Sequence, residues 1–327
     1  MLLLVFIINI SLGSVYIPLK EVFKSIIGSA TEQENFQYII QNYRIPKAIT
    51  AILVGSGLGI SGLLMQTLFR NPLAGPFVLG ISSGASLGVA LVILGSSMFG
   101  GVFATFLISK WSVVIAASLG SFLVLLSVMM VSLKIRDTMA ILIIGLMFAS
   151  ITSAIVSVLS YFGSAEQLQQ YIFWGFGSLG NLSWNELAIF IAIYCIGIIL
   201  GILSIKPLNT LLLGENYAKS LGLNIKRSRL TIIIATSLLA GTITAFVGPI
   251  AFIGLAIPHM TRQIFNTSNH KILLPAVFIF GAIIMLICDS IAQVPNSDLT
   301  LPINAITSLI GAPVVIWLLV RKRKIIF

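Results

Sequence analysis

The chain has 327 residues, of which 58% are hydrophobic and only 9% are charged, against roughly 25% charged residues in an ordinary soluble domain. This composition excludes a soluble globular protein, because a soluble chain of this length must cover its surface with polar side chains. The net charge of +10 does not indicate nucleic-acid binding, because the basic residues lie at the ends of apolar segments rather than in one stripe.

The apolar segments predict an all-α integral membrane protein with about ten transmembrane helices, since each span needs roughly 20 apolar residues. We expect one transmembrane domain over 1–327 and no soluble domain. The first segment lacks the basic start of a signal peptide and predicts the outer part of a first span. Either that helix is genuinely short or the true start lies upstream. The predicted spans are 1–13, 45–68, 77–96, 111–133, 139–161, 185–205, 229–248, 256–266, 272–293 and 304–320.

Two local signals predict helix starts. Asn71-Pro72 combines a capping side chain with a proline suited to the first helical position, which predicts a start near the third span. Ser183 and Glu186 have the spacing of a capping box just before the sixth span.

A third signal predicts a break. Gly248-Pro249 interrupts the apolar run, and we expect the short eighth segment to begin around Pro258. Broken backbone in a membrane must be buried in protein or line a cavity. His259 could gate or sense protons there, but we favour capping or packing. Asp289, in the ninth span, is interpreted as paired with backbone N–H groups or a neighbour rather than as a proton carrier.

Small residues recur every fourth position in two stripes, Gly80, Gly84 and Gly88, and Gly55 and Gly59. Such stripes let helix backbones approach closely in lipid, and close packing alone accounts for them.

The cysteines and histidines do not indicate a metal site. Cys195 and Cys288 lie inside apolar runs and are interpreted as buried small hydrophobic residues. His259 and His270 are too few and too scattered to complete a ligand set with them.

The distribution of Lys and Arg predicts the orientation. With both termini in the cytoplasm, 14 of the 19 basic residues fall on the cytoplasmic side, as the positive-inside rule requires.

No enzyme signature is present, and we expect no catalytic residue and no cofactor in this chain. No Gly-Lys pair exists anywhere, so no Walker A loop can hold ATP phosphates. Ionisable residues inside the spans are scarce, which argues against coupling to an ion gradient and for an energy source outside the chain.

The cytoplasmic stretch 207–227 contains a predicted helix of about two turns between Gly214 and Gly222. Glu215 and Lys219 stand four residues apart in the stabilising order. This pattern fits a helix that docks into another protein's groove and equally a helix lying on the membrane. Its apolar positions include Ala218 and Leu221.

At this point the motifs, taken together and in order, resemble one family over nearly the whole chain: the permease subunits of bacterial ABC importers for iron-siderophores, haem and vitamin B12. The motifs are Arg44–Lys47, Gly62–Gln66, Arg70–Ala74, Leu79–Ala85, Trp174–Gly180, Leu213–Glu215 with Ala218 and Leu221-Gly222, Phe252–Leu255 with Pro258, His259 and Arg262, Asp289, Leu301-Pro302 and Gly311–Pro313.

The resemblance implies a fold and partners. Two ten-helix permeases would form one pathway along their shared axis in the bacterial cytoplasmic membrane. Two separate ATPase subunits, which hold ATP and magnesium, would lie below, and an external binding protein would deliver the cargo. No nucleic acid is implied.

The resemblance also assigns site residues. Segment 208–222 looks like the family's coupling helices, which favours ATPase docking over membrane contact. Arg44 and Lys47 match binding-protein docking positions, although interfacial snorkelling is the simpler alternative for basic side chains. The remaining expected residues are Leu213, Gly214, Glu215, Ala218, Lys219, Leu221 and Gly222 for ATPase coupling, and Thr138, Met139, Ser82, Ser83 and Gly84 for the pathway.

Three departures from the family pattern put docking contacts and substrate identity in doubt. Gln293 stands where some relatives have a third outward arginine, Thr300 replaces an acid, and Asn304 replaces a glycine. The family resemblance favours a ferric siderophore as cargo, with haem and corrinoids as alternatives. Homodimer and heterodimer are both open. An ion-gradient transporter and a membrane scaffold without transport are the rival functions.

Overall fold

The computed structural model describes residues 1–320 except 16, 29–33, 99–108, 135–137 and 295–298. Throughout this described part the regular elements are helices, which confirms the all-α prediction. A π-helical turn at Ile40–Arg44 leads into α4, and 3-10 turns lie at Pro76–Leu79 and Gly95–Met98. The helices are α1 (Leu2–Ser11), α2 (Leu19–Ile27), α3 (Glu34–Ile39), α4 (Ile45–Leu68), α5 (Ile81–Ile93), α7 (Lys110–Lys134), α8 (Thr138–Phe162), α9 (Ala165–Gly175), α10 (Trp184–Leu203), α11 (Ile205–Leu211), α12 (Glu215–Ser220), α13 (Ile225–Val247), α14 (Ile253–Phe265), α15 (His270–Ala292) and α16 (Ile303–Val320).

Six helical segments in the described residues are long and apolar enough to cross a membrane. Three shorter apolar helices, α1, α5 and α16, add candidate spans. The structure therefore confirms a multi-helix membrane domain, and the number ten stays a prediction.

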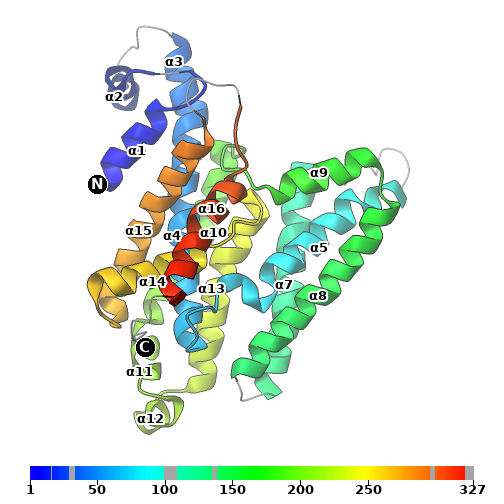
Figure 1. Ribbon diagram of the computed structural model, residues 1–327, viewed down its shortest axis with the longest axis vertical. Coiled ribbons are helices and arrows are strands. Elements are labelled where there is room, and N and C mark those ends of the chain that lie inside the picture. The colour runs from blue at the N-terminus through cyan, green and yellow to red at the C-terminus, as the bar shows by residue number, and fades with distance from the viewer. Residues whose placement is uncertain (16, 29–33, 99–108, 135–137, 295–298, 321–327) are drawn as a thin grey trace.

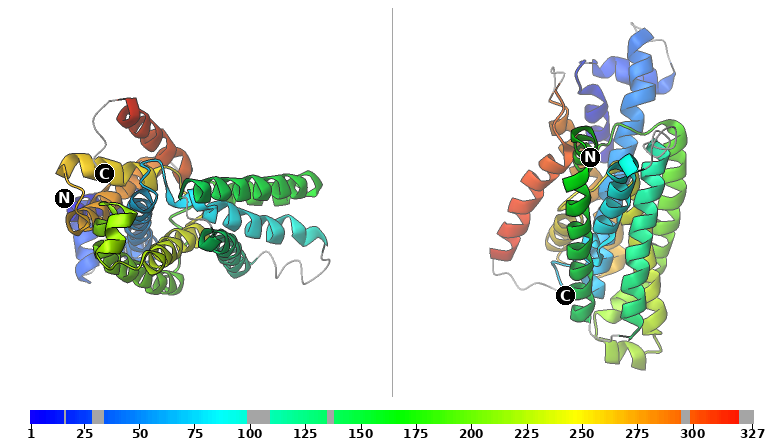
Figure 2. Two further views of the ribbon diagram at one scale, coloured as in Figure 1. Left: turned by 90° about the horizontal axis from the view of Figure 1, so that it is seen from below. Right: turned by 90° about the vertical axis from the view of Figure 1, so that its right-hand side faces the viewer.

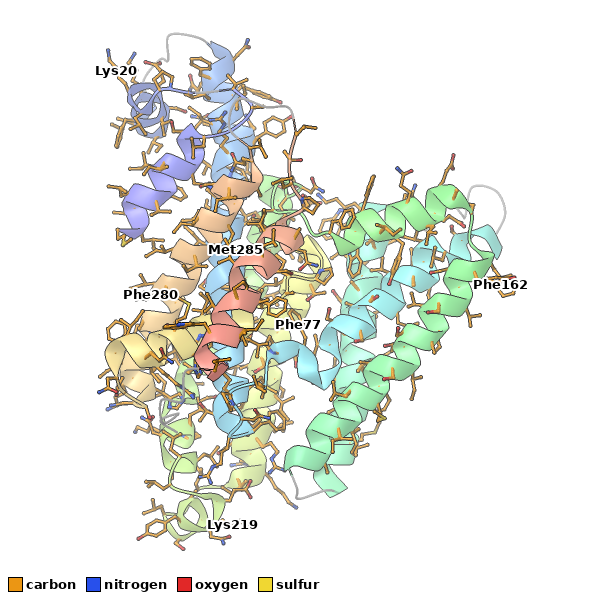
Figure 3. All side chains as sticks on the ribbon, viewed as in Figure 1. Lys20, Phe77, Phe162, Lys219, Phe280 and Met285 are labelled. Carbon is orange, nitrogen blue, oxygen red and sulfur yellow. The ribbon has the colours of Figure 1, made fainter. Side chains whose placement is uncertain are left out.

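Helix α4 is the centre of the fold. Every residue from Leu53 to Leu68 is buried, and α4 contacts α10, α13, α14 and α15. Helices α5, α7, α8 and α9 form a wing beside this body, joined to it mainly through α7 and α13 (Figures 1 and 2). Lys20 and Lys219 lie at opposite ends of the molecule (Figure 3), here called the Lys20 end and the Lys219 end.

The glycine stripes lie where helices cross, as predicted. A Cβ atom added at Gly84 would lie 2.4 Å from the Gly120 carbonyl oxygen, and one at Gly88 would lie 2.0 Å from that of Ala116. On the other side of the molecule, a Cβ at Gly55 would lie 2.1 Å from the Gly281 oxygen. The α5–α7 and α4–α15 contacts therefore require glycine.

Two predicted helix starts are wrong. Asn71 does not cap a helix: its Oδ1 accepts from the Leu73 N–H at 2.9 Å in a local turn, and α5 begins only at Ile81. Pro258 lies inside α14, which begins at Ile253 just after the left-handed Phe252. The chain break at Gly248-Pro249 is present and precedes this helix.

The Ser183–Glu186 capping box is confirmed at the start of α10. A second box, Ser164 with Gln167, begins α9 and was not predicted, although its sequence spacing is the same. Cys195, interpreted as buried, is exposed on α10 in the isolated chain, and Cys288 is buried as expected.

Candidate functional site

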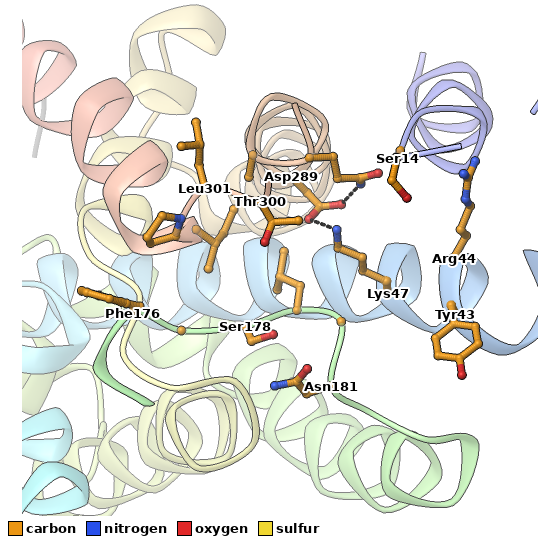
Figure 4. A pocket seen from close by; sticks show the side chains of 18 of the residues that line it. Ser14, Tyr43, Arg44, Lys47, Phe176, Ser178, Asn181, Asp289, Thr300 and Leu301 are labelled. Atoms are coloured by element: carbon orange, nitrogen blue, oxygen red, sulfur yellow. Dashed lines mark hydrogen bonds and ion pairs between the residues drawn. The ribbon is translucent and has the colours of Figure 1, made fainter. Parts of the chain in front are cut away.

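At the Lys20 end, the Asp289 carboxylate has three partners, one on α4, one on α1 and one at the C-cap of its own helix α15; Figure 4 shows Asp289 with Lys47. Its Oδ1 lies 3.1 Å from the Lys47 ammonium of α4, and its Oδ2 accepts from Asn9 at 2.9 Å and from Gln293 at 2.7 Å. The carboxylate is 2% exposed and that lysine side chain 24% exposed. A buried carboxylate needs this degree of satisfaction, because an unpaired charge away from water is costly. The predicted pairing of Asp289 with a neighbour is thus confirmed.

A cavity of about 750 Å³ opens beside this ion pair. Its wall combines charged groups with aromatic rings from α9, from the residue that follows α9 and from the π-helical turn Ile40–Arg44, and Thr300 also lines it (Figure 4). The residues that line it include Tyr43, Arg44, Lys47, Phe173, Phe176, Ser178, Asn181, Asp289, Gln293, Thr300 and Leu301.

Arg44 is held by backbone carbonyls. Its Nη1 donates to the Ile10 oxygen at 2.7 Å and to the Ser11 oxygen at 2.9 Å, and its Nη2 donates to the Val15 oxygen. The Ile10 and Ser11 carbonyls are among those that the end of α1 leaves without helical partners, so a cation there is favourable. Arg44 and Lys47 therefore both have internal partners, and their role in docking a binding protein stays a prediction.

Asn304, the third departure from the family pattern, joins the break after α13 to α9. Its Oδ1 accepts from the Ala251 N–H at 3.0 Å, and its Nδ2 donates to the Gly175 oxygen. An amide side chain at this position thus satisfies two backbone groups that no regular helix pairs.

At the Lys219 end, α11 and α12 form a short hairpin fastened to the body. The Arg70 guanidinium donates to the carbonyls of Leu211 and Leu212 at the end of α11. Glu215 lies 3.1 Å from Arg229 of α13. The predicted partnership of Glu215 with Lys219 is wrong, because the turn at Gly222 brings α13 back alongside α12.

The helix predicted between Gly214 and Gly222 is present, and its two sides differ in exposure, while its coupling role stays a prediction. Gly214 and Gly222 bracket α12, both with positive φ angles that favour glycine. Ala218 is fully buried against the body, whereas Leu213, Tyr217 and Leu221 are each more than 60% exposed. Tyr217 was not among the predicted site residues, although its position one turn after Leu213 gave the signal.

A buried polar cluster lies above this hairpin and was not predicted. His270 Nε2 lies 2.8 Å from Thr67 Oγ1, and its Nδ1 lies 2.7 Å from Asn209 Oδ1 on α11. Arg262 donates to the same threonine hydroxyl at 2.8 Å. The cluster therefore links α4, α11, α14 and α15. His259, on the same helix as Arg262, is buried, which agrees with a packing role.

The predicted pathway residues are separated by the fold. Thr138 and Met139 open α8, but their side chains lie outside the described part of the structure. Ser82 and Ser83 are half-buried at the start of α5, and Gly84 packs against Gly120. Their pathway role stays a prediction. In the described residues no group of three or more His, Cys, Asp or Glu side chains is placed to hold a metal.

Known proteins resemble this chain over nearly its whole length. It is 32% identical over 323 residues to the hemin transport system permease protein HmuU of Yersinia pestis, covering 98% of this chain and 95% of that protein. It is 37% identical over 288 residues to the vitamin B12 import system permease protein BtuC of Klebsiella pneumoniae, covering 88% and 84%.

Solved structures agree. An inward-facing metal-chelate type ABC transporter matches with a TM-score of 0.83 at 31% identity, covering 98% of this chain and 96% of that one. PsaBC from Streptococcus pneumoniae in complex with a Fab shares the fold, with a TM-score of 0.58 at 18% identity and coverage of 92% and 95%. The model of the FecCD transport family matches residues 1–321, and the chain therefore belongs to the FecCD transport family.

Proposed function

We propose that this chain is the membrane-spanning permease subunit of a binding-protein-dependent ABC importer, driven by ATP hydrolysis on separate subunits. The observation that carries the proposal is the surface around α12 at one end of the membrane domain: Ala218 is buried against the body, whereas Tyr217 on the helix and Leu213 and Leu221 beside its two ends are exposed. An exposed apolar helix face of this kind suits the groove of a partner protein. Family membership supports the same conclusion.

The cargo we propose is a metal chelate, with a ferric siderophore first and haem or cobalamin as alternatives. The relatives' names support this class, since HmuU is a hemin permease and BtuC a vitamin B12 permease. Uptake of the three radiolabelled cargoes by cells that carry this importer as their sole route distinguishes them.

The proposed partners are a second permease, two ATPase subunits and an external binding protein, in the bacterial cytoplasmic membrane with both termini inside. Support for the second permease comes from α8 and α16, whose apolar side chains are widely exposed in the isolated chain, among them Ile143, Met147, Val158, Leu309 and Ile316. Exposed apolar side chains of this kind are typical of a surface that contacts another protein or lipid.

The test compares two tyrosines at opposite ends of the molecule. Tyr217→Ala, alone and with Leu213→Ser, is expected to reduce ATPase co-purification and uptake at least tenfold, because exposed aromatic side chains dominate interface energies. Tyr38→Ala is the matched control for ATPase co-purification, since Tyr38 lies on α3 at the Lys20 end and is 60% exposed, against 66% for Tyr217. Unchanged association in the Tyr217 variants would remove the coupling role.

A second experiment separates the importer from an ion-gradient transporter. The purified chain is reconstituted alone in liposomes, and cargo uptake is measured under a proton or sodium gradient. We expect no uptake without the ATPase subunits, and gradient-driven uptake would overturn the proposal.

A further inference from the structure

A second hollow lies within the membrane-spanning part, far from the ion pair at the Lys20 end. Helix α13 packs between α7 and α10 and forms its floor (Figure 2). The hollow, here called the α13 groove, has a volume of about 440 Å³, within the roughly 300–1,000 Å³ of small-molecule sites. Its lining residues are Ile81, Ser118, Ser121, Phe122, Leu125, Leu126, Ile193, Ile234, Ser237, Leu238, Gly241 and Thr242.

The α13 groove is apolar in effect despite its serines. Ser118 and Ser237 donate to the carbonyls four residues earlier in their helices, at 2.8 and 2.7 Å, and Ser121 donates to the Ile81 oxygen at 3.0 Å. Because these hydroxyl groups already donate hydrogen bonds within the protein, they do not need an acceptor from a bound molecule. Phe122 is 57% exposed at the groove, so the opening faces the surroundings of the helices rather than the protein core. Three of the four hydroxyl groups at the groove are thus bonded within the protein, and apart from these hydroxyl residues and Gly241 the lining side chains are apolar, so a hydrocarbon chain fits this lining best.

The basic side chain of Arg227 lies on the same face of α13 as the residues that line the groove. At 100° per residue, Arg227 falls in the middle of the α13 face formed by Ile234, Ser237, Leu238 and Gly241. Arg227 is exposed, and among the described residues its guanidinium forms no ion pair. Lys226 is equally exposed but lies at the edge of this face, beside the line of Ser237 and about a quarter-turn from Arg227.

The spacing between cation and groove fits a lipid. Arg227 and Leu238 are eleven residues apart on one helix, which is about 16 Å along the axis at 1.5 Å per residue. One leaflet of the hydrocarbon core is about 15 Å deep, half of the roughly 30 Å total. A phosphate at Arg227 would therefore place the end of its acyl chain in the groove, near the bilayer midplane.

We infer that the α13 groove and Arg227 form a binding site for one anionic phospholipid, with an acyl chain in the groove and the headgroup phosphate on the guanidinium. The site faces the leaflet at the Lys219 end. It is independent of the transported cargo and of ATPase docking, because Arg229 rather than Arg227 pairs with α12.

The test measures lipid retained by the full chain in detergent, by native mass spectrometry, with phosphatidylglycerol or phosphatidylcholine of identical acyl chains. The unaltered protein is expected to prefer phosphatidylglycerol roughly fivefold, the effect of one basic side chain at a membrane surface. Arg227→Gln is expected to abolish the preference while both lipids still bind. Lys226→Gln is the matched control and is expected to keep it.

A second test of lipid binding fills the α13 groove with a larger side chain. A Cβ at Gly241 meets its nearest neighbour only at 3.8 Å, so Gly241→Leu extends into the hollow without a backbone clash. Gly241→Leu is expected to reduce retention of both lipids, and Ser237→Leu, at a half-buried position, provides the same test if the first variant folds poorly. Equal retention of the two lipids by the unaltered protein, equal effects of the Arg227 and Lys226 changes, or undiminished binding in both filled variants would each overturn the site.

Discussion

Gly62→Ala is expected to be among the most destabilising single changes in the chain. A Cβ atom at Gly62 would lie 1.6 Å from the Gly254 carbonyl oxygen, which is backbone and cannot rotate away. That carbonyl lies four residues before Pro258, which has no N–H to bond it, so it is free to point at α4. We expect a loss of about 3 kcal/mol or more, at the upper end of overpacking costs. Thermal unfolding of the purified chain in detergent measures it.

Alanine substitutions at two other glycines are expected to cost less stability, in proportion to the space around each one. A Cβ at Gly59 would lie 3.0 Å from the Val277 side chain, which can shift, so Gly59→Ala is expected to cost less. Gly175 has nothing within 4 Å, and Gly175→Ala is expected to leave stability unchanged or to raise it by up to about 1 kcal/mol, because alanine favours helix. Equal stability of the Gly62 and Gly175 variants would contradict the close α4–α14 contact.

Hydropathy and local caps predicted the long helices well. The predicted span 45–68 coincides with α4, 185–205 with Trp184–Leu203, and 272–293 with His270–Ala292. These helices are continuous apolar runs of spanning length, with a cap or proline marking their starts, so local sequence carries their limits.

Local sequence signals gave wrong helix starts at Asn71 and Pro258, because each of these patterns is compatible with two different local structures. An asparagine before a proline suits a helix cap and also the turn that Asn71 actually forms, in which its side chain bonds two residues ahead. Pro258 suits a helix start, but α14 begins five residues earlier, at Ile253. Its missing N–H is tolerated inside the helix because the freed Gly254 carbonyl lies against Gly62.

The partners of the charged residues could not be predicted, because tertiary packing selects them. Lys47 looked like an outward surface charge, and only the crossing of α4 with α15 brings it to Asp289. For Glu215, sequence spacing suggested Lys219 as the partner, whereas the fold brings Arg229 within 3.1 Å of its carboxylate. Sequence spacing thus located the two ends of the molecule where charge matters, but not the pairs.

The Lys47–Asp289 pair provides the second large effect. Asp289→Ala is expected to destabilise the chain by roughly 3–5 kcal/mol, because it removes the acceptor of the Lys47 ammonium and of the Gln293 amide. The Asn9 amide loses one acceptor and keeps the Leu286 carbonyl and the Ser290 hydroxyl. Lys47→Met is expected to cost a similar amount, since it leaves the 2% exposed carboxylate with only neutral donors. Chemical or thermal unfolding in detergent measures both.

The double variant Lys47→Met/Asp289→Leu decides whether the two groups act as a pair. Its destabilisation is expected to fall short of the sum of the single changes by about 1–3 kcal/mol, the coupling range of contacting residues. Lys110→Met is the control: Lys110 lies 2.7 Å from Glu186 and is 45% exposed, and the 9% exposed carboxylate keeps the Ser183 N–H and hydroxyl as donors, so the loss is expected to be about 1 kcal/mol. Additive single changes would contradict the pairing. Coupling would mean that a Lys47→Glu charge reversal, placed against Asp289, disturbs the fold as well as any docked binding protein. Arg44 also has internal partners, so a docking test on either residue requires an unfolding measurement on the same variant.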